Sequence, residues 1–583
     1  MKKRITAMLS MVLALTLLCG CAGMSGLGGN MGFASGKKGY GSSGHGGEMP
    51  VFDEIEYVRP DIEAIEAAVA EVEQALANGA GLVKLSDDID RCYEAYYDFY
   101  TMYNLANVRA CQNMRDEYYA GEYSWCSDHS SAVQKAMEDM LYACGTSDMA
   151  QKLEEQCFWP GFVQAYSDAG ESVYNDRTME LMRRESALIS EYRALVAAPT
   201  IQGDGVEVDY YSYISDLYDE EYSEAMLQYY RKYNGELSRI YIDLVKVRRE
   251  LAEELGFDSY EQMQYSYYFE RDYSPEQAAE YVADIKEYMV PFYESVIAAD
   301  PYSDIYYDYL SDTELHAVLR SAAAKMGGQV EEAFSFMSDY ELYDIRLSSD
   351  KAAMSFQTYL TNYEAPFLFL DPYGDTEDIL SFAHEFGHYV DAYVNYDAYE
   401  TIDVSESFSQ SMEYLTLSYL DGSMSRAELD NLYRMKMMDT LELYVQQASF
   451  AEFEMTVYST DPELLSAEML NALSLELAKE YGYYDGESEE YYAMSWSDIV
   501  HFYEMPFYII SYPVSNDVAM QIYELEQRQE GMGLEKYLEM LPRTYEGFLD
   551  TVEAGGLQSP FAPGRIQQVV EDLRGRLTWA NAA

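Results

Sequence analysis

The stretch SFAHEFGHYV, residues 381–390, constrains the fold more than any other part of the chain. Two of only six histidines, His384 and His388, stand four residues apart, and Glu385 follows the first. Residues four apart share one face of an α-helix, so both imidazoles can reach one Zn²⁺ ion at about 2.0–2.1 Å. Glu385 can then accept a proton from a water beside that ion. The motif predicts a zinc site with its own base; the alternative is a surface helix with two incidental histidines.

A short apolar run, APFLFLDPYG (365–374), precedes this helix. Its composition and its closing proline and glycine are typical of a β-strand followed by a turn. Asp375 or Thr376 can cap the helix that follows. The strand can hold an extended peptide by backbone pairing, or it can be an ordinary core strand. The sequence leaves these two alternatives open.

A hydrolytic zinc ion needs a third protein ligand and an open coordination position. The acidic segment that follows offers Asp403, Glu406 and Glu413. Glu406 and Glu413 lie on one face of the expected helix, but spacing alone does not choose the ligand. Other groups should orient the two imidazoles, and Asp391 and Glu413 are the candidates.

Beyond residue 50 the chain is patterned mainly as α-helix with a few short strands. Ser274, followed by a proline, is the expected N-cap of one helix. The segment TIQGDGVEVDYYSY predicts a short hairpin with an Asp-Gly turn. Apolar residues recur at helical spacing in four long runs, at 62–79, 178–199, 223–256 and 274–299.

The length of 583 residues exceeds what one compact core accommodates. We expect an N-terminal helical lobe at 51–200 and a catalytic region at 201–583. The formal net charge of −65 repels nucleic acid phosphates and excludes DNA or RNA as partners. The same charge attracts cations and weakly favours basic peptides; its simplest consequence is solubility.

The N-terminus has the pattern of an export signal. Three basic residues precede an apolar stretch at 5–18 that is too short to span a membrane. It ends in LLCGC, which resembles a bacterial lipoprotein signal. Residues 1–20 are then the signal peptide, and Cys21 carries the lipid that anchors an exported protein at the cell surface. A plain secretory signal is the alternative.

Residues 21–50 are rich in glycine, include His45, and are typical of a flexible tether. The cysteines beyond it form no CxxC pair, which argues against a cysteine-bound zinc. They can form at most two disulfides, or stay reduced, and the sequence leaves the pairing open. These cysteines are Cys92, Cys111, Cys126, Cys144 and Cys157.

HEFGH followed by SESFSQSMEYL resembles the zinc metallopeptidases of the thimet oligopeptidase and oligoendopeptidase F family. In that family the third ligand is a glutamate that opens a helix after HExxH, in a pattern like E-x-x-S-Q-x-x-E. Glu406, Ser409, Gln410 and Glu413 fit this pattern. The resemblance therefore implies Glu406 as the third ligand. It covers the chain from about residue 175 to the end.

The stretch HFYEMPFYIISY is similar to the family's His-x-x-x-x-P-F-Y-x-x-x-Y segment. There a histidine and tyrosines face the zinc, so the resemblance implies His501, Tyr508 and Tyr512 as hydrogen-bond donors to the tetrahedral intermediate. Which tyrosine faces the zinc is open. With 60 tyrosines in the chain, core packing is the alternative for each. His129 and His316 are expected to be structural.

The resemblance also implies the architecture and activity. We expect two mostly helical lobes around a deep substrate channel, with a small β-sheet next to the HExxH helix. The function it implies is a zinc-dependent endopeptidase, with one Zn²⁺ per chain, that hydrolyses short unstructured oligopeptides outside the cytoplasm. Two alternatives remain: a non-catalytic peptide- or solute-binding lipoprotein on a peptidase fold, and a structural metal site. The oligomeric state is open.

Overall fold

A computed structural model describes residues 49–158, 161–168, 175–197, 199–203, 205–210, 213, 219–396, 401–486, 488–543 and 547–578. The predicted signal peptide, Cys21 and His45 lie outside these residues, as does the tether apart from residues 49 and 50. The division into lobes at residue 200 stays a prediction.

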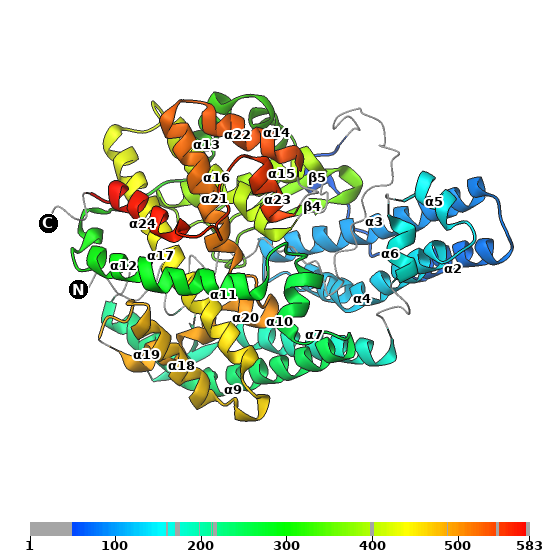
Figure 1. Cartoon of the computed structure of the whole chain (residues 1–583), viewed down its shortest axis with the longest axis horizontal. Coiled ribbons are helices and arrows are strands. Elements are labelled where there is room, and N and C mark those ends of the chain that lie inside the picture. Colours follow the sequence, from blue (N-terminus) through cyan, green and yellow to red (C-terminus); the bar gives the residue numbers. More distant parts are fainter. Residues whose placement is uncertain are drawn as a thin grey trace.

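The chain is mainly α-helical (Figure 1). The helices are α2 (Ile62–Ala77), α3 (Leu82–Gln112), α4 (Glu117–Gly145), α5 (Ala150–Gln156), α6 (Phe162–Asp168), α7 (Asp176–Ala197), α9 (Asp219–Glu254), α10 (Tyr260–Met263), α11 (Pro275–Asp284), α12 (Val290–Ile297), α13 (Asp312–Met326), α14 (Gly328–Asp339), α15 (Asp378–Asn395), α16 (Ile402–Tyr419), α17 (Arg426–Ser459), α18 (Ala467–Glu480), α19 (Glu489–Met494), α20 (Val500–Glu504), α21 (Ser511–Arg528), α22 (Met532–Met540), α23 (Phe548–Ala554) and α24 (Arg565–Arg576).

The long helical runs predicted from periodicity are confirmed, with one change. The runs at 62–79, 178–199 and 223–256 are α2, α7 and α9. The run at 274–299 is not one regular helix, because a π-helical turn at Ile285–Met289 separates α11 from α12. Pro291 follows this turn and has no backbone N–H to donate, which disfavours a regular helix there. Ser274 caps α11 as predicted and forms a capping box with Gln277.

The strands form two small sheets. The predicted hairpin is confirmed as β1 (Thr200–Gly203) and β2 (Val206–Asp209), which pair antiparallel. The second sheet contains β3 (Tyr343–Asp344), β4 (Phe356–Leu360) and β5 (Ala365–Phe369) in the order β3-β5-β4. β5 pairs parallel with β3 and antiparallel with β4.

β5, the strand expected before the HExxH helix, is the central strand of its sheet. All five of its residues are buried, and it pairs with a neighbour on each side. The structure favours the core-strand alternative over peptide binding, because β4 pairs along the whole of one edge, β3 pairs with Leu368 and Phe369 on the other, and all five residues are buried. It is a core strand, and it leads directly into the turn before α15.

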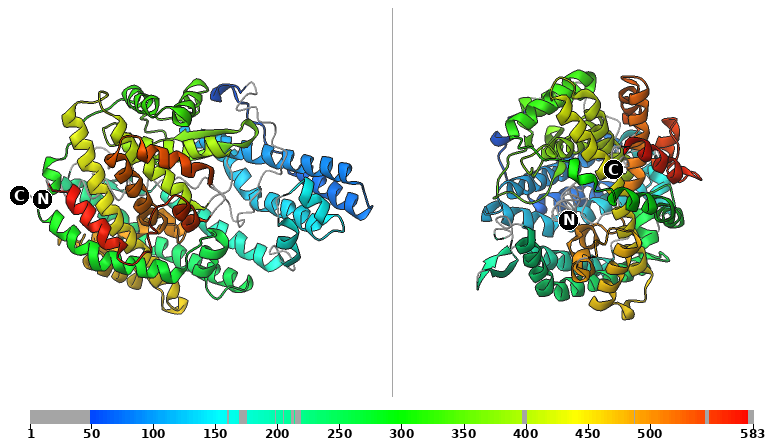
Figure 2. Two further views of the ribbon diagram at one scale, coloured as in Figure 1. Left: turned by 45° about the horizontal axis from the view of Figure 1, so that its top comes forward. Right: turned by 90° about the vertical axis from the view of Figure 1, so that its left-hand side faces the viewer.

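The helices lie in two main groups, and a smaller group projects from one end (Figures 1 and 2). One main group holds α13 to α16 and α21 to α23, with the three-stranded sheet at its side. The other holds α7, α9, α18 and α19, and α17 contacts helices of both groups. The prediction of a mainly α chain with two helical lobes and a small sheet beside the motif helix is confirmed. Among the described helices, none combines the length and the apolar character that a membrane span requires.

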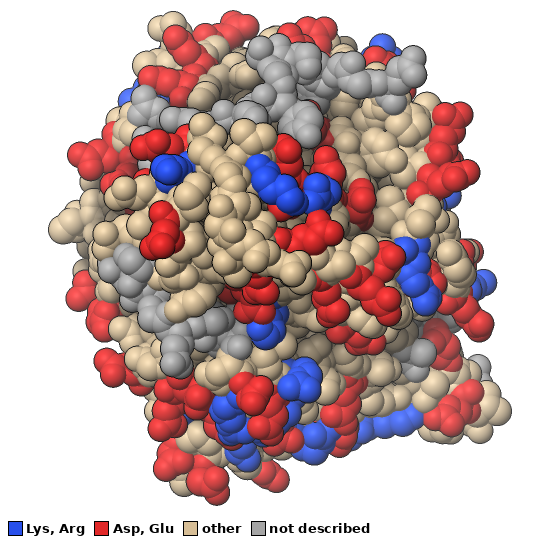
Figure 3. Space-filling view, turned by 90° about the vertical axis from the view of Figure 1, so that its right-hand side faces the viewer, with Lys and Arg blue, Asp and Glu red and all other residues tan. Residues whose placement is uncertain are grey.

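The projecting group, α2 to α6, has a separate apolar core that includes Leu85, Leu141 and Phe162. None of its five cysteines forms a disulfide among the described residues, and all but Cys157 are buried. Figure 3 shows one end of the molecule, where acidic side chains are spread over most of the surface and basic ones gather in a few places. This end of the molecule thus carries the excess of acidic side chains that the net charge predicts.

Candidate metal centre

The turn before α15 is fixed from within the helix itself. The carboxylate of Asp378, the first helical residue, accepts hydrogen bonds from the backbone N–H groups of Tyr373, Gly374 and Asp375 at 2.7–3.1 Å. The prediction that Asp375 or Thr376 caps the helix is wrong. The N-cap is Glu377, whose side chain makes no capping hydrogen bond.

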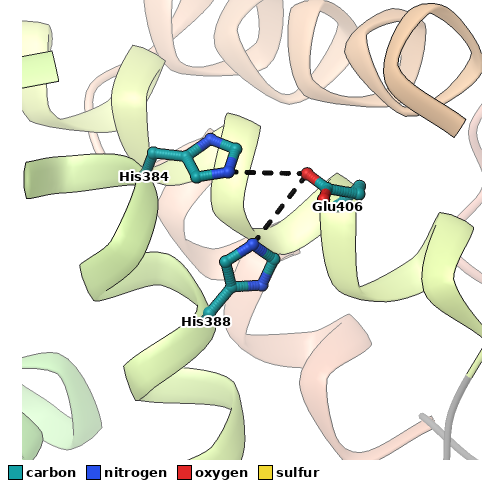
Figure 4. Close-up of side chains that lie close together, drawn as sticks. All are labelled: His384, His388 and Glu406. Carbon is teal, nitrogen blue, oxygen red and sulfur yellow. Dashed lines mark ion pairs between the residues drawn. The ribbon is translucent and has the colours of Figure 1, made fainter. Parts of the chain in front are cut away.

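The contact between α15 and α16 depends on Gly387, the fourth residue of the HEFGH motif. A Cβ atom at this position would lie 2.5 Å from Ser409 Cα and 2.8 Å from the Phe408 carbonyl oxygen. Only a glycine permits so close an approach of the two backbones. This approach places Glu406 of α16 opposite the two histidines of α15 (Figure 4).

Three side chains form a cluster that could hold a metal ion: His384, His388 and Glu406. Glu406 Oε2 lies 3.5 Å from His384 Nε2 and 3.9 Å from His388 Nε2. Ligand atoms of a tetrahedral zinc site, each about 2.0–2.2 Å from the ion, are roughly 3.3 Å apart. The two distances are close to those of a zinc site, and three protein ligands would leave the fourth position of a tetrahedral ion for solvent or substrate.

The buried polar atoms of this cluster also fit a cation. His388 Nε2 is buried and has no hydrogen-bond partner in the described part of the chain. A buried nitrogen without a partner is costly, and a metal ion would satisfy it. Glu406 is completely buried, and the two histidines are 2% and 4% exposed. The nitrogen and oxygen donors present are those that Zn²⁺ takes in proteins.

The two imidazoles are oriented through their other ring nitrogens. His384 Nδ1 is 2.8 Å from Glu413 Oε1, and the second oxygen of Glu413 accepts a hydrogen bond from Lys436 Nζ at 2.5 Å. His388 Nδ1 is 3.0 Å from Ser405 Oγ. Such contacts fix the ring so that Nε2 faces the ion.

The two carboxylates of the pocket stabilise positive charge on one of the two imidazoles. Burial lowers the pKa of His384, but the hydrogen bond with Glu413 and the charge of Glu406 outweigh it and raise the pKa to about 9. Burial and the neighbouring His384 keep the pKa of His388 well below its ordinary value. Burial opposes ionisation of Glu413 too, yet Lys436 and His384 lower its pKa. A divalent cation would interact favourably with the same two carboxylates.

The segment at 500–512 completes the site. Tyr508 donates a hydrogen bond to Glu406 Oε1 at 2.5 Å. His501 Nε2 is 3.2 Å from Tyr512 Oη. The ring centres of His501, Tyr508 and Tyr512 lie 5.2–5.7 Å from one another. The structure thus brings His501, Tyr508 and Tyr512 together next to the cluster, although the sequence alone did not settle which tyrosine faces it. Glu385, on the turn of α15 between the histidines, is fully buried.

Sequence reasoning identified Glu413 as an orienting group but missed Lys436 and Ser405. Lys436 stands in the apolar run MKMM on α17 and is 2% exposed, and a lysine within such a run was the available signal. The other candidate, Asp391, accepts a hydrogen bond from Asn395 Nδ2 at 2.7 Å.

His129 and His316 lie in structural settings away from the cluster. His129 Nδ1 is 2.7 Å from the Trp125 carbonyl oxygen, and its ring stacks on that tryptophan. His316 Nε2 is 3.1 Å from Ser338 Oγ, and its ring stacks on Tyr343.

Comparison with known proteins identifies the family. The profile of the peptidase M3 N-terminal domain matches residues 52–165, and that of peptidase family M3 matches residues 322–544, which include the whole cluster. The chain belongs to peptidase family M3. The expected resemblance to oligoendopeptidase F is thereby confirmed.

Curated relatives support this assignment. Oligopeptidase PepF of Bacillus subtilis is 22% identical over 525 residues, which cover 79% of this chain and 76% of that protein. The chromosomal oligoendopeptidase F of Lactococcus lactis subsp. cremoris is 25% identical over 202 residues, a third of each chain.

Solved structures share the fold. A PZ peptidase A with an inhibitor has a TM-score of 0.78 at 24% identity, covering 91% of this chain and 99% of the other. An oligoendopeptidase F of Bacillus anthracis has a TM-score of 0.75 at 24% identity, covering 92% and 99%. At this level of identity, the similarity shows that this chain shares one fold with these proteins over about nine-tenths of its length.

Proposed function

We propose that this M3 peptidase is a zinc-dependent endopeptidase that hydrolyses short unstructured oligopeptides outside the cytoplasm. The observation that carries the proposal is the buried cluster of His384, His388 and Glu406, with Glu385 on the same helix turn. These three residues fit one zinc ion per chain. Together with Glu385 as a base, they supply the ligands and the proton acceptor that peptide hydrolysis needs.

Bound zinc would supply a Lewis acid that makes water nucleophilic near neutral pH and polarises the peptide carbonyl. Glu385 takes the proton of the attacking water and passes it to the leaving amine. Burial lowers the pKa of His501 to about 3, so its imidazole is neutral at pH 7. His501 and Tyr512 donate hydrogen bonds where negative charge develops on the substrate oxygen, and Tyr508 joins them once its single hydroxyl proton turns from Glu406 Oε1 to the substrate.

The substrate class rests on an expected feature of the architecture. We infer that peptides enter a deep channel between the two lobes, with the buried cluster at its floor. A narrow channel admits extended oligopeptides and excludes folded proteins. The two curated relatives are an oligopeptidase and an oligoendopeptidase, which supports short peptides as substrates. Rapid digestion of a native globular protein would contradict the channel.

The location is a separate proposal that rests on the N-terminal signal. Cys21 carries the lipid, and the glycine-rich tether holds the catalytic region away from a bacterial membrane. A Cys21→Ser variant should move from the membrane fraction to the soluble fraction of the expressing cells. Equal membrane association of both proteins would refute the lipid anchor.

The decisive experiment for the activity compares the wild type with Glu385→Gln. The variant keeps all three ligands, so it should bind one zinc per chain, while peptide turnover should fall by about 10²–10⁴-fold. A wild-type protein that binds peptides and zinc without cleaving them would favour the non-catalytic lipoprotein. A Glu385→Gln variant with normal turnover would remove Glu385 as the base.

A further inference from the structure

A buried arginine outside the cluster connects the parts of the site. The side chain of Arg271 is fully buried. Its Nε donates to Asp403 Oδ2 at 3.1 Å, its Nη1 to the Phe507 carbonyl oxygen at 2.8 Å, and its Nη2 to Ser511 Oγ at 2.8 Å. One guanidinium therefore joins the first turn of α16 to the middle of the loop between α20 and α21 and to the first residue of α21.

The three groups that Arg271 binds are sequence neighbours of three proposed site residues. Asp403 lies one helical turn before Glu406, Phe507 immediately precedes Tyr508, and Ser511 immediately precedes Tyr512. The guanidinium is planar and presents its N–H groups in a fixed fork. This rigid group therefore helps to set the distance between the ligand-bearing helix and the two tyrosines, beside Gln410 Nε2 of α16, which donates to the Tyr512 carbonyl oxygen at 3.2 Å.

The loop that Arg271 holds is strained. Phe507 has φ +64°, a left-handed conformation that costs free energy for a residue with a Cβ. Its carbonyl is held by Arg271, and its N–H donates to Glu454 Oε1 at 3.0 Å. A strained conformation persists only where its surroundings hold it. Here Arg271 holds the carbonyl group of Phe507 and Glu454 holds its N–H group.

The partners of Arg271 are themselves held. Asp403 Oδ1 accepts a hydrogen bond from Tyr273 Oη at 3.1 Å, and its carbonyl oxygen accepts one from Ser515 Oγ at 2.7 Å. The guanidinium carbon lies 4.6 Å from the ring centre of Tyr265 and 4.5 Å from that of Phe269. These contacts compensate the burial of the charge and leave the guanidinium a single orientation.

We propose that Arg271 is a positioning residue that sets the hydroxyl groups of Tyr508 and Tyr512 relative to Glu406. The inference rests on the proposed peptidase activity and adds a residue that touches neither metal nor substrate. Tyr508 donates to Glu406 at 2.5 Å, so a small shift of the loop relative to α16 breaks this contact. The ligand cluster itself does not include any atom of Arg271.

The test is an Arg271→Lys variant, which keeps the charge but loses the planar fork. We expect one zinc per chain as in the wild type, a KM within about twofold, and a kcat that falls about 10–100-fold, since misplacing a donor costs up to about a hundredfold. Affinity for a phosphinic peptide, which mimics the tetrahedral intermediate, should fall by the same factor as kcat.

Arg565→Lys is the matched control. Arg565 is 5% exposed and binds Asp517 of α21 through three contacts of 2.6–2.9 Å, but it bonds neither α16 nor the loop. It should lower the melting temperature and leave kcat unchanged. If Arg271→Lys does not fold, Ser511→Ala replaces it as the test, because it removes one of the three partners of Arg271. The kcat of Ser511→Ala should fall about 3–10-fold while its zinc content stays unchanged.

Two results would overturn the role of Arg271. One is a kcat within twofold of the wild type in Arg271→Lys, or in Ser511→Ala where the lysine variant does not fold. The other is loss of zinc from Arg271→Lys, which would make the residue a support of the ligands rather than of the tyrosines. Absence of peptide turnover in the wild type would instead contradict the proposed function itself.

Discussion

Glu413 determines how the first imidazole of the cluster is oriented. It binds His384 Nδ1 with one oxygen and Lys436 Nζ with the other, and all three side chains are at least nine-tenths buried. The lysine keeps the carboxylate ionised, and the carboxylate keeps the proton of His384 on Nδ1. His384 Nε2 then faces Glu406 Oε2 at 3.5 Å, where a metal ion would bind between them.

Replacing Glu413 by glutamine should weaken zinc binding by about 10–100-fold, because the charge that orients and strengthens the ligand is lost. Competition with a chelator of known affinity measures this. Ser405→Ala, which removes the neutral contact to His388 Nδ1, is the comparison and should cost less. Wild-type zinc affinity in Glu413→Gln would show that this contact does not support the ligand.

The residues of the site differ in how far the sequence predicts them. His384, Glu385 and His388 follow from spacing along one helix. Glu406 could be chosen as the third ligand only from the family pattern, because spacing within an acidic segment does not distinguish it from the neighbouring carboxylates. Ser405 and Lys436 were not predicted, since their roles depend on how α15, α16 and α17 cross, and side-chain periodicity carries no information about crossing geometry.

At the scale of elements, the crossing of α15 and α16 is the contact on which the site depends. The ligands lie on different helices, so their separation follows from how closely the two backbones approach at Gly387. The spacing of the motif carries no information on which helix packs against this glycine. Likewise Ser274 was correctly predicted to cap α11, a local effect, whereas the cap of α15 depends on how Asp378 folds back on the preceding turn.

A Gly387→Ala substitution should destabilise the protein by about 1–3 kcal/mol, because the added methyl group would overlap backbone atoms of α16. Thermal unfolding measures the change, and zinc affinity should fall with it. Gly235→Ala on α9 is the control: nothing lies within 4 Å of its Cβ position, so the higher helix propensity of alanine should stabilise the helix slightly. Equal effects of both substitutions would contradict the proposed role of the contact.

The long helix α17 carries buried carboxyls that make stability depend on pH. Burial raises the pKa of Glu442 from 4.5 to about 8, and its carboxyl accepts a hydrogen bond from Tyr302 Oη. The folded protein thus retains a proton that the unfolded chain releases between these values. The contribution of Glu442 to stability is complete below pH 4.5 and is lost as the pH rises through about 8.

The free energy of unfolding should therefore fall between pH 5 and 8, and Glu442→Gln should reduce this slope by up to about 1.4 kcal/mol per pH unit. Denaturant unfolding at several pH values gives the slope. Substitution of the exposed Glu66 on α2 by glutamine should leave it unchanged. An unaltered slope in Glu442→Gln would mean that this carboxyl is already ionised in the folded protein at pH 5.

At the scale of the whole molecule, the two helical groups and the small sheet were predicted correctly, because helical periodicity and family resemblance both carry that information. The separate core of α2 to α6 was not predicted. The acidic surface is a property of composition alone, and it raises the local concentration of metal ions and of cationic peptides around the molecule. Because many acidic residues share this effect, replacing any one of them should change peptide hydrolysis little.

The central claim is that one zinc ion, held by His384, His388 and Glu406, makes the protein a peptidase. The most direct measurement removes metal with a chelator and titrates Zn²⁺ back while peptide cleavage is followed on the same sample. We predict no cleavage without metal, a linear rise, and a plateau at one equivalent of zinc per chain. Cleavage by metal-free protein, or full zinc binding without any cleavage, would contradict the account.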